Sequence, residues 1–577
     1  MKLVSMSVKN FRGINGKNTT VSFEGSDIIF LLGQNNVGKS TILTAYEYLV
    51  TPKQKAIISD FNGFSEKNPI EIEAVFKKET NDDEIFKKKG FEKWVEHSTS
   101  LIRFRKRWTT SGVEGKKETW NPEEGIFVEN GFGGLETHFT KHAPTPVRIP
   151  AMSTPDELSK WISDIIKKTV LAKLKIEEEE TYSKLLKEFT SFQEKILSKD
   201  SVKKLGETAN INFKKVFPHL TIEVNTDFGT EIDLAKSFEK DFNVTIKDTR
   251  LGTINQSFTS HGHGVIRQTM FNFLGLVKNE LPVNDTTQSQ SKDFIILFEE
   301  PEIFLHPKAI NSLRKVLYEL CTDSPFQILC ASHSPNLIDI SKPHTSLVRI
   351  VKDDNLKTFI HQVKHDLFTG SEQRKKQVQM INRFNPYVCE SFFCDEVVIV
   401  EGDTEAIVIR ELLENLAPER DIFVLNSGSK NNITFFQEIF TYFRINHYII
   451  HDSDTPYIYN TSGEIVQNKD GSNKKNSAWK LNADIWNKVL EANDISPMLA
   501  RRFVHIPNFE GAHNYKYESS KGKPLSAYDF VKGLDINENI PIVNFVKYIL
   551  LNDQQLEEFF QENLVAYFNL IEFPING

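Results

Sequence analysis

The N-terminal part of the chain alternates apolar and polar residues in short runs, and a period of two predicts β-strands. Strand-like runs cover residues 4–8, 20–23, 28–32, 70–76 and 101–108, and the third of them is apolar throughout instead of alternating. Between the third and fourth runs, residues 40–49 carry apolar side chains at the three- and four-residue spacing of a helix. The pattern therefore predicts a β-rich region built around one helix.

From residue 155 the periodicity becomes that of helices. Apolar residues recur every three or four positions over 158–174 and again over 185–196, and the acidic run 177–180 separates the two stretches. Two amphipathic stretches joined by a polar turn predict an antiparallel helical pair. Because strand-like runs resume near residue 220, we interpret the pair as an insertion into a sheet domain, with a role in packing or dimerisation.

Two apolar runs lead straight into clusters of carboxylates. Residues 294–298 precede Glu299-Glu300-Pro301-Glu302, and residues 397–400 precede Glu401-Gly402-Asp403-Thr404-Glu405. A continuous apolar run is typical of a strand buried on both faces, and open α/β sheets bind their ligands where such strands end. Carboxylate oxygens there are typical ligands of hard divalent cations. The chain is therefore predicted to be an α/β protein with two separate metal sites.

The length of 577 residues is too great for one hydrophobic core. We predict one sheet domain formed by residues 1–154 and 216–375, the helical insertion at 155–215, and a second α/β domain at 376–577. A polar, basic stretch around residues 369–383 is the expected linker.

Composition narrows the class of protein. The chain is 39% apolar and 26% charged, as expected for a globular protein, and no apolar run approaches the roughly 20 residues of a membrane span. The N-terminus lacks a secretory apolar segment, so we expect a cytoplasmic protein without membrane contact. The four cysteines form no CxxC pair, which disfavours a zinc ribbon. The net charge of −8 disfavours a protein that is positively charged over its whole surface, but it is compatible with a local basic groove that binds nucleic acid.

A phosphate-binding loop lies between the predicted strand 28–32 and the helix that follows it. Gly33-Gln-Asn-Asn-Val-Gly38-Lys39-Ser40 fits the pattern G-x-x-x-x-G-K-[ST]. The glycines allow backbone N–H groups to surround phosphates, Lys39 reaches the β- and γ-phosphates, and the Ser40 hydroxyl binds Mg²⁺. In this setting Glu299 is placed to hold the Mg²⁺ through water and Glu300 to orient an attacking water. His333, after the buried run 326–331, is a candidate sensor of the γ-phosphate.

The second carboxylate cluster has no phosphate loop before it. Glu401 and Glu405 are four residues apart at a strand-to-helix turn, so both carboxylates can converge on one cation. Farther along, the run 448–451 leads to Asp452 and Asp454, which strand alternation would place on one face. Oxygen ligands alone suit Mg²⁺ or Mn²⁺, and this number of carboxylates can hold two ions for in-line attack on a phosphodiester. The alternative is that these acids are solvated strand ends without a function. That alternative explains either pair of acids by itself, but it explains the occurrence of both pairs poorly.

The order of these motifs resembles the ABC-type ATPase head shared by SMC and RecF proteins. The resemblance rests on Asn10-Phe11-Arg12, residues 33–40, Ser260-His-Gly262-His-Gly264, Glu299-Glu300-Pro301, Leu305-His306-Pro307 and His333. It implies that ATP is closed between two protomers, with Ser260 and Gly262 of one facing the phosphate loop of the other. The implied nucleotide and Mg²⁺ ligands are Arg12, Gly33, Asn36, Gly38, Lys39, Ser40, Thr41, Ser260, Gly262, Glu299 and His333. Glu299 stands where an aspartate is commoner, so hydrolysis is expected to be slow or binding alone to be the signal.

One pattern is similar to the Toprim domain of topoisomerases, primases and nucleases. It consists of a strand followed by E-G-x-x-E and then a second strand that ends in D-x-D. An ABC-like head followed by such a domain resembles the OLD (overcoming lysogenization defect) family, which includes the nuclease subunit of Gabija defence and some retron effectors. The resemblance implies that the helical insertion mediates dimerisation. It also implies a later acid and a lysine in the nuclease centre, for which Glu510 and Lys523 stand in suitable positions. A solvated loop lysine is an equally good interpretation of Lys523.

These patterns together predict an ATP-regulated, metal-dependent DNA endonuclease or nickase of prokaryotic antiphage defence. The family is compatible with a helicase subunit, or with a reverse transcriptase and its DNA, as the partner. The alternative is an ATP-dependent clamp or scaffold whose Toprim domain binds DNA without cutting it. A topoisomerase activity, in which one DNA strand passes through another, is disfavoured. It needs a nucleophilic tyrosine on a separate DNA-binding domain, and the sequence offers no segment for that domain.

Overall fold

The structure is a computed structural model, and it describes most of the two sheet-forming regions. The described residues are 1–129 apart from 16–18, 24 and most of 80–90, then 142–151, 245–247, 255–257, 262–267, 294–363 apart from 323–325, 341, 343–344 and 354, and 386–551, together with a few single positions. The predicted helical pair at 155–215, Ser260 and most of the predicted linker lie outside these residues.

The chain divides into two compact units. The first comprises Met1–Ala151, Lys292–Glu302 and Pro325–Gly577, and the second comprises Met152–Ser291 and Ile303–Ser324. In the second unit the described elements are β9 (Thr245–Lys247), β10 (Asn255–Ser257) and α9 (Pro307–Leu320). The first unit holds three larger sheets, and both predicted sites lie in it.

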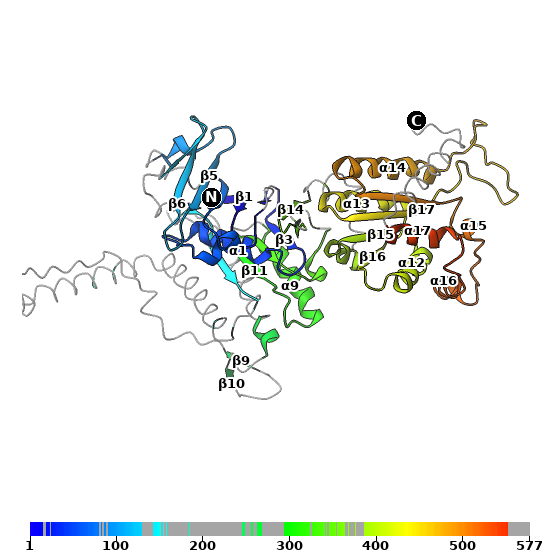
Figure 1. Cartoon of the computed structure of the whole chain (residues 1–577), viewed down its shortest axis with the longest axis horizontal. Coiled ribbons are helices and arrows are strands. Elements are labelled where there is room, and N and C mark those ends of the chain that lie inside the picture. Colours follow the sequence, from blue (N-terminus) through cyan, green and yellow to red (C-terminus); the bar gives the residue numbers. More distant parts are fainter. Residues whose placement is uncertain are drawn as a thin grey trace, which may run out of the picture. The chain divides into compact units, whose positions relative to one another are not determined.

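An antiparallel sheet occupies the N-terminal part of the first unit (blue to cyan in Figure 1). Its strands lie in the order β2 (Thr20–Ser22), β1 (Lys2–Lys9), β4 (Ile70–Lys77), β5 (Leu101–Trp108), β6 (Lys116–Asn121) and β7 (Ile126–Glu129). Along β4 and β5 every second side chain is buried, as the alternating sequence predicts. Two of the basic residues of β5 that face away from the core are paired, since Arg105 contacts Glu118 at 2.5 Å and Arg107 contacts Glu71 at 3.3 Å.

A second sheet of the first unit carries the phosphate loop. Its order is β14 (Thr358–Gln362), β13 (Thr345–Lys352), β3 (Ile28–Leu32), β12 (Phe326–Ala331), β11 (Phe294–Glu299) and β8 (Thr145–Ile149), and only β14 is antiparallel to its neighbour. All five residues of β3 are buried. Helix α1 (Lys39–Val50) packs its apolar side into a core that residues of both sheets share. The parallel arrangement brings the ends of β3, β11 and β12 to one edge.

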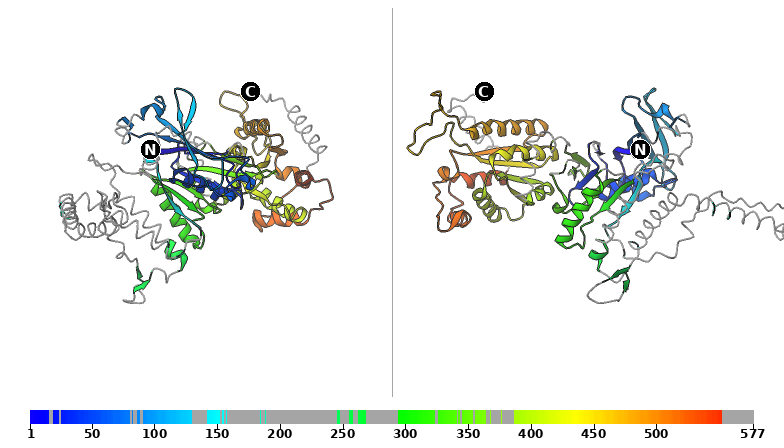
Figure 2. Two further views of the ribbon diagram at one scale, coloured as in Figure 1. Left: turned by 60° about the vertical axis from the view of Figure 1, so that its left-hand side comes forward. Right: turned by 180° about the vertical axis from the view of Figure 1, so that it is seen from behind.

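The C-terminal sheet is entirely parallel, in the order β16 (Ile422–Asn426), β15 (Glu396–Val400), β17 (Asn446–Asp452) and β18 (Ala500–His505). Helices α12 (Asp403–Leu416), α16 (Gly522–Lys532) and α17 (Pro541–Leu551) cover one face, and α13 (Lys430–Phe443) and α14 (Ser477–Ile495) cover the other (Figures 1 and 2). The short helix α15 (Phe509–His513) follows β18. Because both faces are covered, β15 and β16 are largely apolar, whereas β17 and β18 also bury arginine and histidine side chains.

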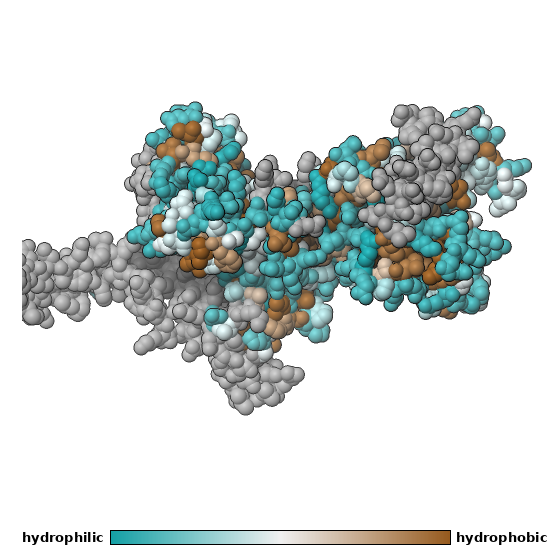
Figure 3. Space-filling model, viewed as in Figure 1, coloured by the Kyte–Doolittle hydropathy of each residue, from teal (hydrophilic) through white to brown (hydrophobic). Residues whose placement is uncertain are grey.

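The remaining described elements are short 3₁₀ turns: η1 (Ile58–Asp60), η2 (Asn62–Phe64), η4 (Glu92–Trp94), η7 (Pro335–Leu337) and η8 (Pro386–Phe393). The surface in Figure 3 is largely hydrophilic, with apolar residues scattered over the described part. Among the helices of the described residues, none is both long and apolar enough to cross a membrane. All four cysteines are free, and Cys321, Cys330 and Cys389 are buried.

Candidate functional site

The predicted phosphate loop connects β3 to α1 and has a backbone that requires glycine. Gly33 has φ 138°, and a Cβ atom there would lie 2.3 Å from the backbone oxygen of Ile350. Gly38 has φ 114° and Asn36 has φ 64°, so the loop turns through left-handed conformations on the way into α1. Ser40 is exposed and Thr41 half-buried in the first turn of that helix. The loop therefore presents a helix N-terminus and a hydroxyl to solvent, as phosphate binding requires.

Lys39 is folded back onto this loop. Its ammonium donates hydrogen bonds to the backbone oxygens of Gly33 at 2.9 Å and Gln34 at 2.7 Å. Burial lowers the pKa of Lys39 to about 8, and the charges of Glu300 and Glu302 act in the opposite direction. A partly desolvated ammonium held only by neutral carbonyls can exchange them for phosphate oxygens at little cost.

The acids after β11 point to different partners. Glu299 accepts a hydrogen bond from Arg148 at 2.9 Å, whereas a Glu300 oxygen lies 3.6 Å from Nε2 of His333. Glu302, which sequence reasoning did not single out, accepts from the Ser332 hydroxyl at 2.7 Å and from the backbone N–H of His333 at 2.8 Å. Glu302 thus holds His333 beside the phosphate loop. Its signal in the sequence was the third acid of the run that begins at Glu299.

Three further predicted nucleotide ligands lie apart from the phosphate loop in the sequence. Arg12 is paired with the buried Asp60 at 2.9 Å, and its guanidinium lies 5.1 Å from the ring centre of Phe11. Gly262 precedes a short helical turn in the second unit, and Ser260 lies outside the described residues. The contact of Ser260 and Gly262 with another protomer stays a prediction.

The second carboxylate cluster gathers at the ends of two C-terminal strands and in the first turn of a helix. Glu401 follows β15, Glu405 lies in the first turn of α12, and Asp452 is the last residue of β17. Glu401 accepts a long hydrogen bond of 3.4 Å from the backbone N–H of Asp452. Asp452 in turn accepts one of 2.9 Å from the backbone N–H of Phe509, in the first turn of α15. Glu401 and Asp452 are thereby each held by the backbone of a neighbouring segment.

A third kind of ligand joins this cluster. His505 ends β18 and is paired in register with Asp452. One ligand atom each of Glu405, Asp452 and His505 lie within 4.8 Å of one another. These three side chains, together with Glu401, are the described groups best placed to hold a divalent cation. Sequence reasoning missed His505, which belongs to none of the motifs identified there.

The pKa values of three acids in the cluster are raised, which indicates that positive charge among the described residues does not fully compensate their charged forms. Burial, and then the charges of neighbouring acids, raise the pKa of Glu401 to about 7. Burial is also the first cause that raises the pKa of Glu405 to about 7 and that of Asp452 to about 7. Three carboxylates that resist ionisation together would be relieved by a bound cation, so the donor set fits the predicted metal.

Asp454 does not share a strand face with Asp452 by alternation, so that part of the prediction was wrong. The strand ends at Asp452, and Asp454 has φ 61° with its backbone N–H bonded to the Pro507 oxygen at 2.8 Å. Its carboxylate forms a 2.6 Å ion pair with Lys430. Asp454 nevertheless remains close enough to raise the pKa of Asp452 by its charge.

Lys430 is a second residue that sequence reasoning missed. It is 3% exposed, lies at the start of α13, and also donates to the backbone oxygen of Asp452 at 2.6 Å. Lys523, the predicted lysine, is exposed at the start of α16, and within the described part of the chain it makes no hydrogen bond or ion pair. Glu510 is exposed in the first turn of α15, and its charge acts on Asp452 and Glu405. The structure therefore brings Glu510 and Lys430 to the cluster.

Comparison with known proteins assigns these two sites to known domains. A model of the AAA ATPase domain matches residues 1–121 and 148–338, more than half of the chain. A model of the overcoming lysogenization defect protein-like TOPRIM domain matches residues 392–454, which include Glu401, Glu405 and Asp452. This chain belongs to the AAA ATPase family and carries an OLD-like TOPRIM domain.

The relatives of this AAA–TOPRIM chain are named as nucleases. The Old nuclease of Escherichia phage P2 is 25% identical over 435 residues, which are 72% of this chain and 70% of that protein. The OLD nuclease of Thermus scotoductus is 23% identical over 42% of this chain and 44% of its own length, and the endonuclease GajA of Bacillus cereus is 28% identical over 31% and 28%. The predicted likeness to the OLD family is confirmed, and so is the fold class of an α/β ATPase head followed by a TOPRIM domain.

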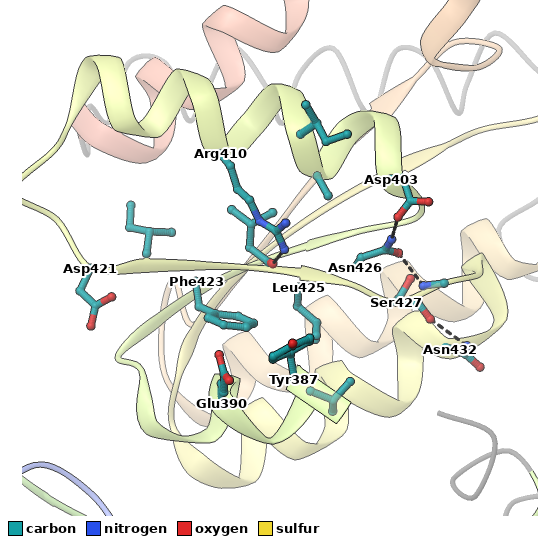
Figure 4. A pocket seen from close by; sticks show the side chains of 16 residues that line it. Tyr387, Glu390, Asp403, Arg410, Asp421, Phe423, Leu425, Asn426, Ser427 and Asn432 are labelled. Atoms are coloured by element: carbon teal, nitrogen blue, oxygen red, sulfur yellow. Dashed lines mark hydrogen bonds between the residues drawn. The ribbon is translucent and has the colours of Figure 1, made fainter. Parts of the chain in front are cut away.

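The TOPRIM domain also has a cavity of about 1020 Å³ along β16, the edge strand of its sheet, between η8 and α12 (Figure 4). Arg410 spans it to donate to the Val424 oxygen at 2.9 Å, and Asp403 accepts from Asn426 at 2.7 Å. Glu390, Asp403 and Asp421 make the lining acidic. Because these acids repel phosphates, this cavity is not a place for the nucleic-acid backbone.

Proposed function

We propose that this chain is an ATP-regulated DNA endonuclease or nickase that cuts phosphodiesters with two divalent metal ions in prokaryotic antiphage defence. The observation that carries the proposal is the partly buried group of Glu401, Glu405 and Asp452, which gathers two adjoining strand ends and the first turn of α12 in an OLD-like TOPRIM domain. The names of the relatives support nuclease chemistry, and the resemblance to the OLD family supports the defence role.

The residues of the site have different roles in binding metal and phosphate. Glu401, Glu405 and Asp452 would hold one Mg²⁺ or Mn²⁺, and Glu510 and Asp454, whose charges act on Asp452, are the acids that would contribute to a second. When bound, such ions polarise the phosphate and lower the pKa of a coordinated water. Lys430 forms an ion pair with Asp454, and its positive charge reduces the repulsion between the acidic site and a phosphate. It also donates a hydrogen bond to the backbone oxygen of Asp452 at the end of β17. The backbone N–H of Phe509 keeps Asp452 aimed at the site.

Cleavage of supercoiled plasmid by the purified full-length chain tests this function. We expect nicked or linear product with Mn²⁺ or Mg²⁺ and none with EDTA. If neither metal supports cleavage, with or without ATP and its non-hydrolysable analogue, the nuclease assignment fails and the clamp or scaffold is the better account.

We further propose that the ATPase domain acts in a homodimer, with Ser260 and Gly262 facing the phosphate loop of the second protomer, and that a helicase subunit or a reverse transcriptase with its DNA is the partner. These assignments are supported by the resemblance of the motifs to ABC-type heads and to the OLD family. Mg²⁺ beside Ser40 and Glu299 completes the proposed nucleotide site.

Contacts within the first unit offer a route by which the phosphate loop can influence the nuclease site. The Gln34 side chain donates to Asp395 at 2.8 Å, and Asp395 also pairs with the buried Arg349 at 2.5 Å. Arg349 donates to the backbone oxygen of Phe443 at 3.0 Å. Asp395 immediately precedes β15, and Glu401 follows the other end of the same strand. A loop that rearranges around ATP would therefore act on the strand that presents a metal ligand.

Gln34→Ala should weaken regulation without removing nucleotide binding, because the side chain is exposed and points to Asp395. We expect ATP affinity to change by no more than about threefold, while the ratio of cleavage rates with and without ATP moves toward one. Asn35→Ala, at the neighbouring exposed position, is the matched control and should keep the wild-type ratio. An unchanged ratio in the Gln34 variant would rule out this route.

The raised pKa values predict a pH dependence of stability in the metal-free protein. Glu401, Glu405 and Asp452 have folded-state pKa values of about 7, above the ordinary values of 4.5 and 3.8. The folded state therefore binds more protons than the unfolded state between about pH 4 and 7, so their stabilisation is lost as pH rises through about 7. We expect the Tm with EDTA to fall between about pH 5.5 and 8, and Mn²⁺ to restore it at the higher pH. A Tm with EDTA that rises or stays level over this range would contradict the prediction.

A further inference from the structure

His505 differs from the other histidines of the TOPRIM domain in its hydrogen bonding. It is 1% exposed, and neither of its ring nitrogens has a hydrogen-bond partner among the described residues. In contrast, one nitrogen each of His447, His451 and His513 lies 2.8 to 3.0 Å from a backbone oxygen. A buried imidazole that serves only packing ordinarily satisfies its N–H group. Two unsatisfied nitrogens in one buried ring therefore indicate a missing partner.

The position of the ring shows where that partner would lie. Nδ1 of His505 is 3.5 Å from a carboxylate oxygen of Asp452, too far for a strong hydrogen bond. Burial lowers the pKa of His505 to about 3, so the imidazole is neutral and offers a lone pair, not a positive charge. Phe503 and Phe509 present their rings edge-on at centroid distances of 5.6 and 5.1 Å, which leaves the ring few ways to turn. A neutral imidazole held against a carboxylate is the arrangement of a mixed nitrogen and oxygen metal site.

The three candidate ligand atoms are close to coordination distance. One atom each of Glu405, Asp452 and His505 lie within 4.8 Å of one another. Metal–ligand bonds of about 2.1 Å place two ligands at most about 4.2 Å apart, so a small inward movement closes the site. Side chains supply the ligands from the ends of β17 and β18 and from α12, so strand order and helix placement hold them in advance.

We propose that His505 is a nitrogen ligand of one catalytic divalent cation, together with Glu405 and Asp452, and that it makes this site favour a transition-metal ion such as Mn²⁺ over Mg²⁺. Mg²⁺ keeps oxygen ligands and gives up its waters reluctantly, whereas imidazole raises affinity along the transition-metal series. The inference rests on the proposed function only in taking these acids to be the nuclease centre. It replaces the oxygen-only ligand set predicted from the sequence.

Pulsed EPR of Mn²⁺ bound to the full-length chain measures the nitrogen ligand directly, without reference to activity. We expect ¹⁴N modulation from a coordinated imidazole in the wild type and its loss in His505→Phe, which keeps an aromatic ring among Phe503 and Phe509. His447→Phe is the matched control, because His447 is also 1% exposed but lies at the opposite end of the neighbouring strand. This control should keep the modulation.

Competition of Mg²⁺ against bound Mn²⁺ gives the second readout. In His505→Phe we expect the Mn²⁺ affinity to fall about tenfold or more and the Mg²⁺ affinity to change by less than about threefold. His505→Gln repeats both measurements with a side chain that retains a polar atom, should the first variant fail to fold.

The outcomes separate this inference from the nuclease function. Absence of ¹⁴N modulation in the wild type with Mn²⁺ bound, or its persistence in the His505 variants, overturns the ligand assignment even if the plasmid is cut. Modulation that depends on His505 in a protein that never cuts DNA supports the ligand and overturns the nuclease. Failure of the wild type to bind Mn²⁺ overturns the ligand assignment, and the plasmid assay with Mg²⁺ then decides the nuclease function by itself.

Discussion

Glu405→Gln is expected to reduce plasmid cleavage by about a thousandfold or more while making the metal-free protein no less stable. Glu405 is 6% exposed, and burial followed by the charges of Asp452 and Glu401 raises its pKa to about 7. The neutral amide has the same shape and escapes the cost of a buried charge, so folding is preserved or improved. The amide oxygen is uncharged and binds a divalent cation more weakly than a carboxylate does. The weaker metal stabilisation of the transition state costs several kcal/mol.

The measurements for this variant are cleavage of supercoiled plasmid with Mn²⁺, Mn²⁺ affinity, and Tm with EDTA. Glu414→Gln, on the exposed side of the same helix, is the matched control and should behave as the wild type in all three. Cleavage at the wild-type rate by the Glu405 variant would remove this carboxylate from the mechanism. A large drop in Tm would show instead that the charge supports the fold.

Lys39→Ala is expected to lower ATP affinity by about a hundredfold or more and to leave Mn²⁺ binding at the TOPRIM domain unchanged. The ammonium is buried, and its contacts to Gly33 and Gln34 are to neutral oxygens that phosphate can replace. Removing it deletes a charge-assisted hydrogen bond to the β- and γ-phosphates.

Binding of a fluorescent ATP analogue and Mn²⁺ titration measure the two sites separately. Lys67→Ala, at an exposed position away from the loop, should bind ATP as the wild type does. Cleavage by the Lys39 variant should no longer respond to added ATP. Comparison of its cleavage rate with that of the wild type in ATP then shows whether ATP activates or inhibits cleavage. ATP affinity within about threefold of the wild type would show that the loop does not hold the phosphates in the expected way.

The phosphate loop was predictable because its chemistry is local. Gly33, Gly38, Lys39 and Ser40 lie within eight consecutive positions, and the strand before them and the helix after them show in the same stretch of sequence. The structure has β3 at Ile28–Leu32, as predicted, and starts α1 one residue earlier than expected. The pair Glu401 and Glu405 was visible for the same reason, since one strand-to-helix turn holds both.

The prediction for Asp454 was wrong in its geometry because strand alternation was extended past the end of the strand. The backbone N–H of Ser453 bonds to the His505 oxygen, and that of Asp454 bonds to the Pro507 oxygen, so neighbouring segments turn the chain at this point. No pattern within residues 448–454 records those partners. The carboxylate was identified from the sequence, but its direction was decided by the segment after β18.

The sequence by itself determined the two domain types, the phosphate loop and the acids that follow their strands, because each depends on residues a few positions apart. Only the tertiary structure decided which distant side chains complete the sites. Glu302 reaches the loop of His333, Lys430 reaches Asp454, and His505 reaches Asp452 across a parallel sheet. The order and register of parallel strands set these meetings, and both depend on the packing of helices over the whole sheet. A short sequence motif contains no record of that packing.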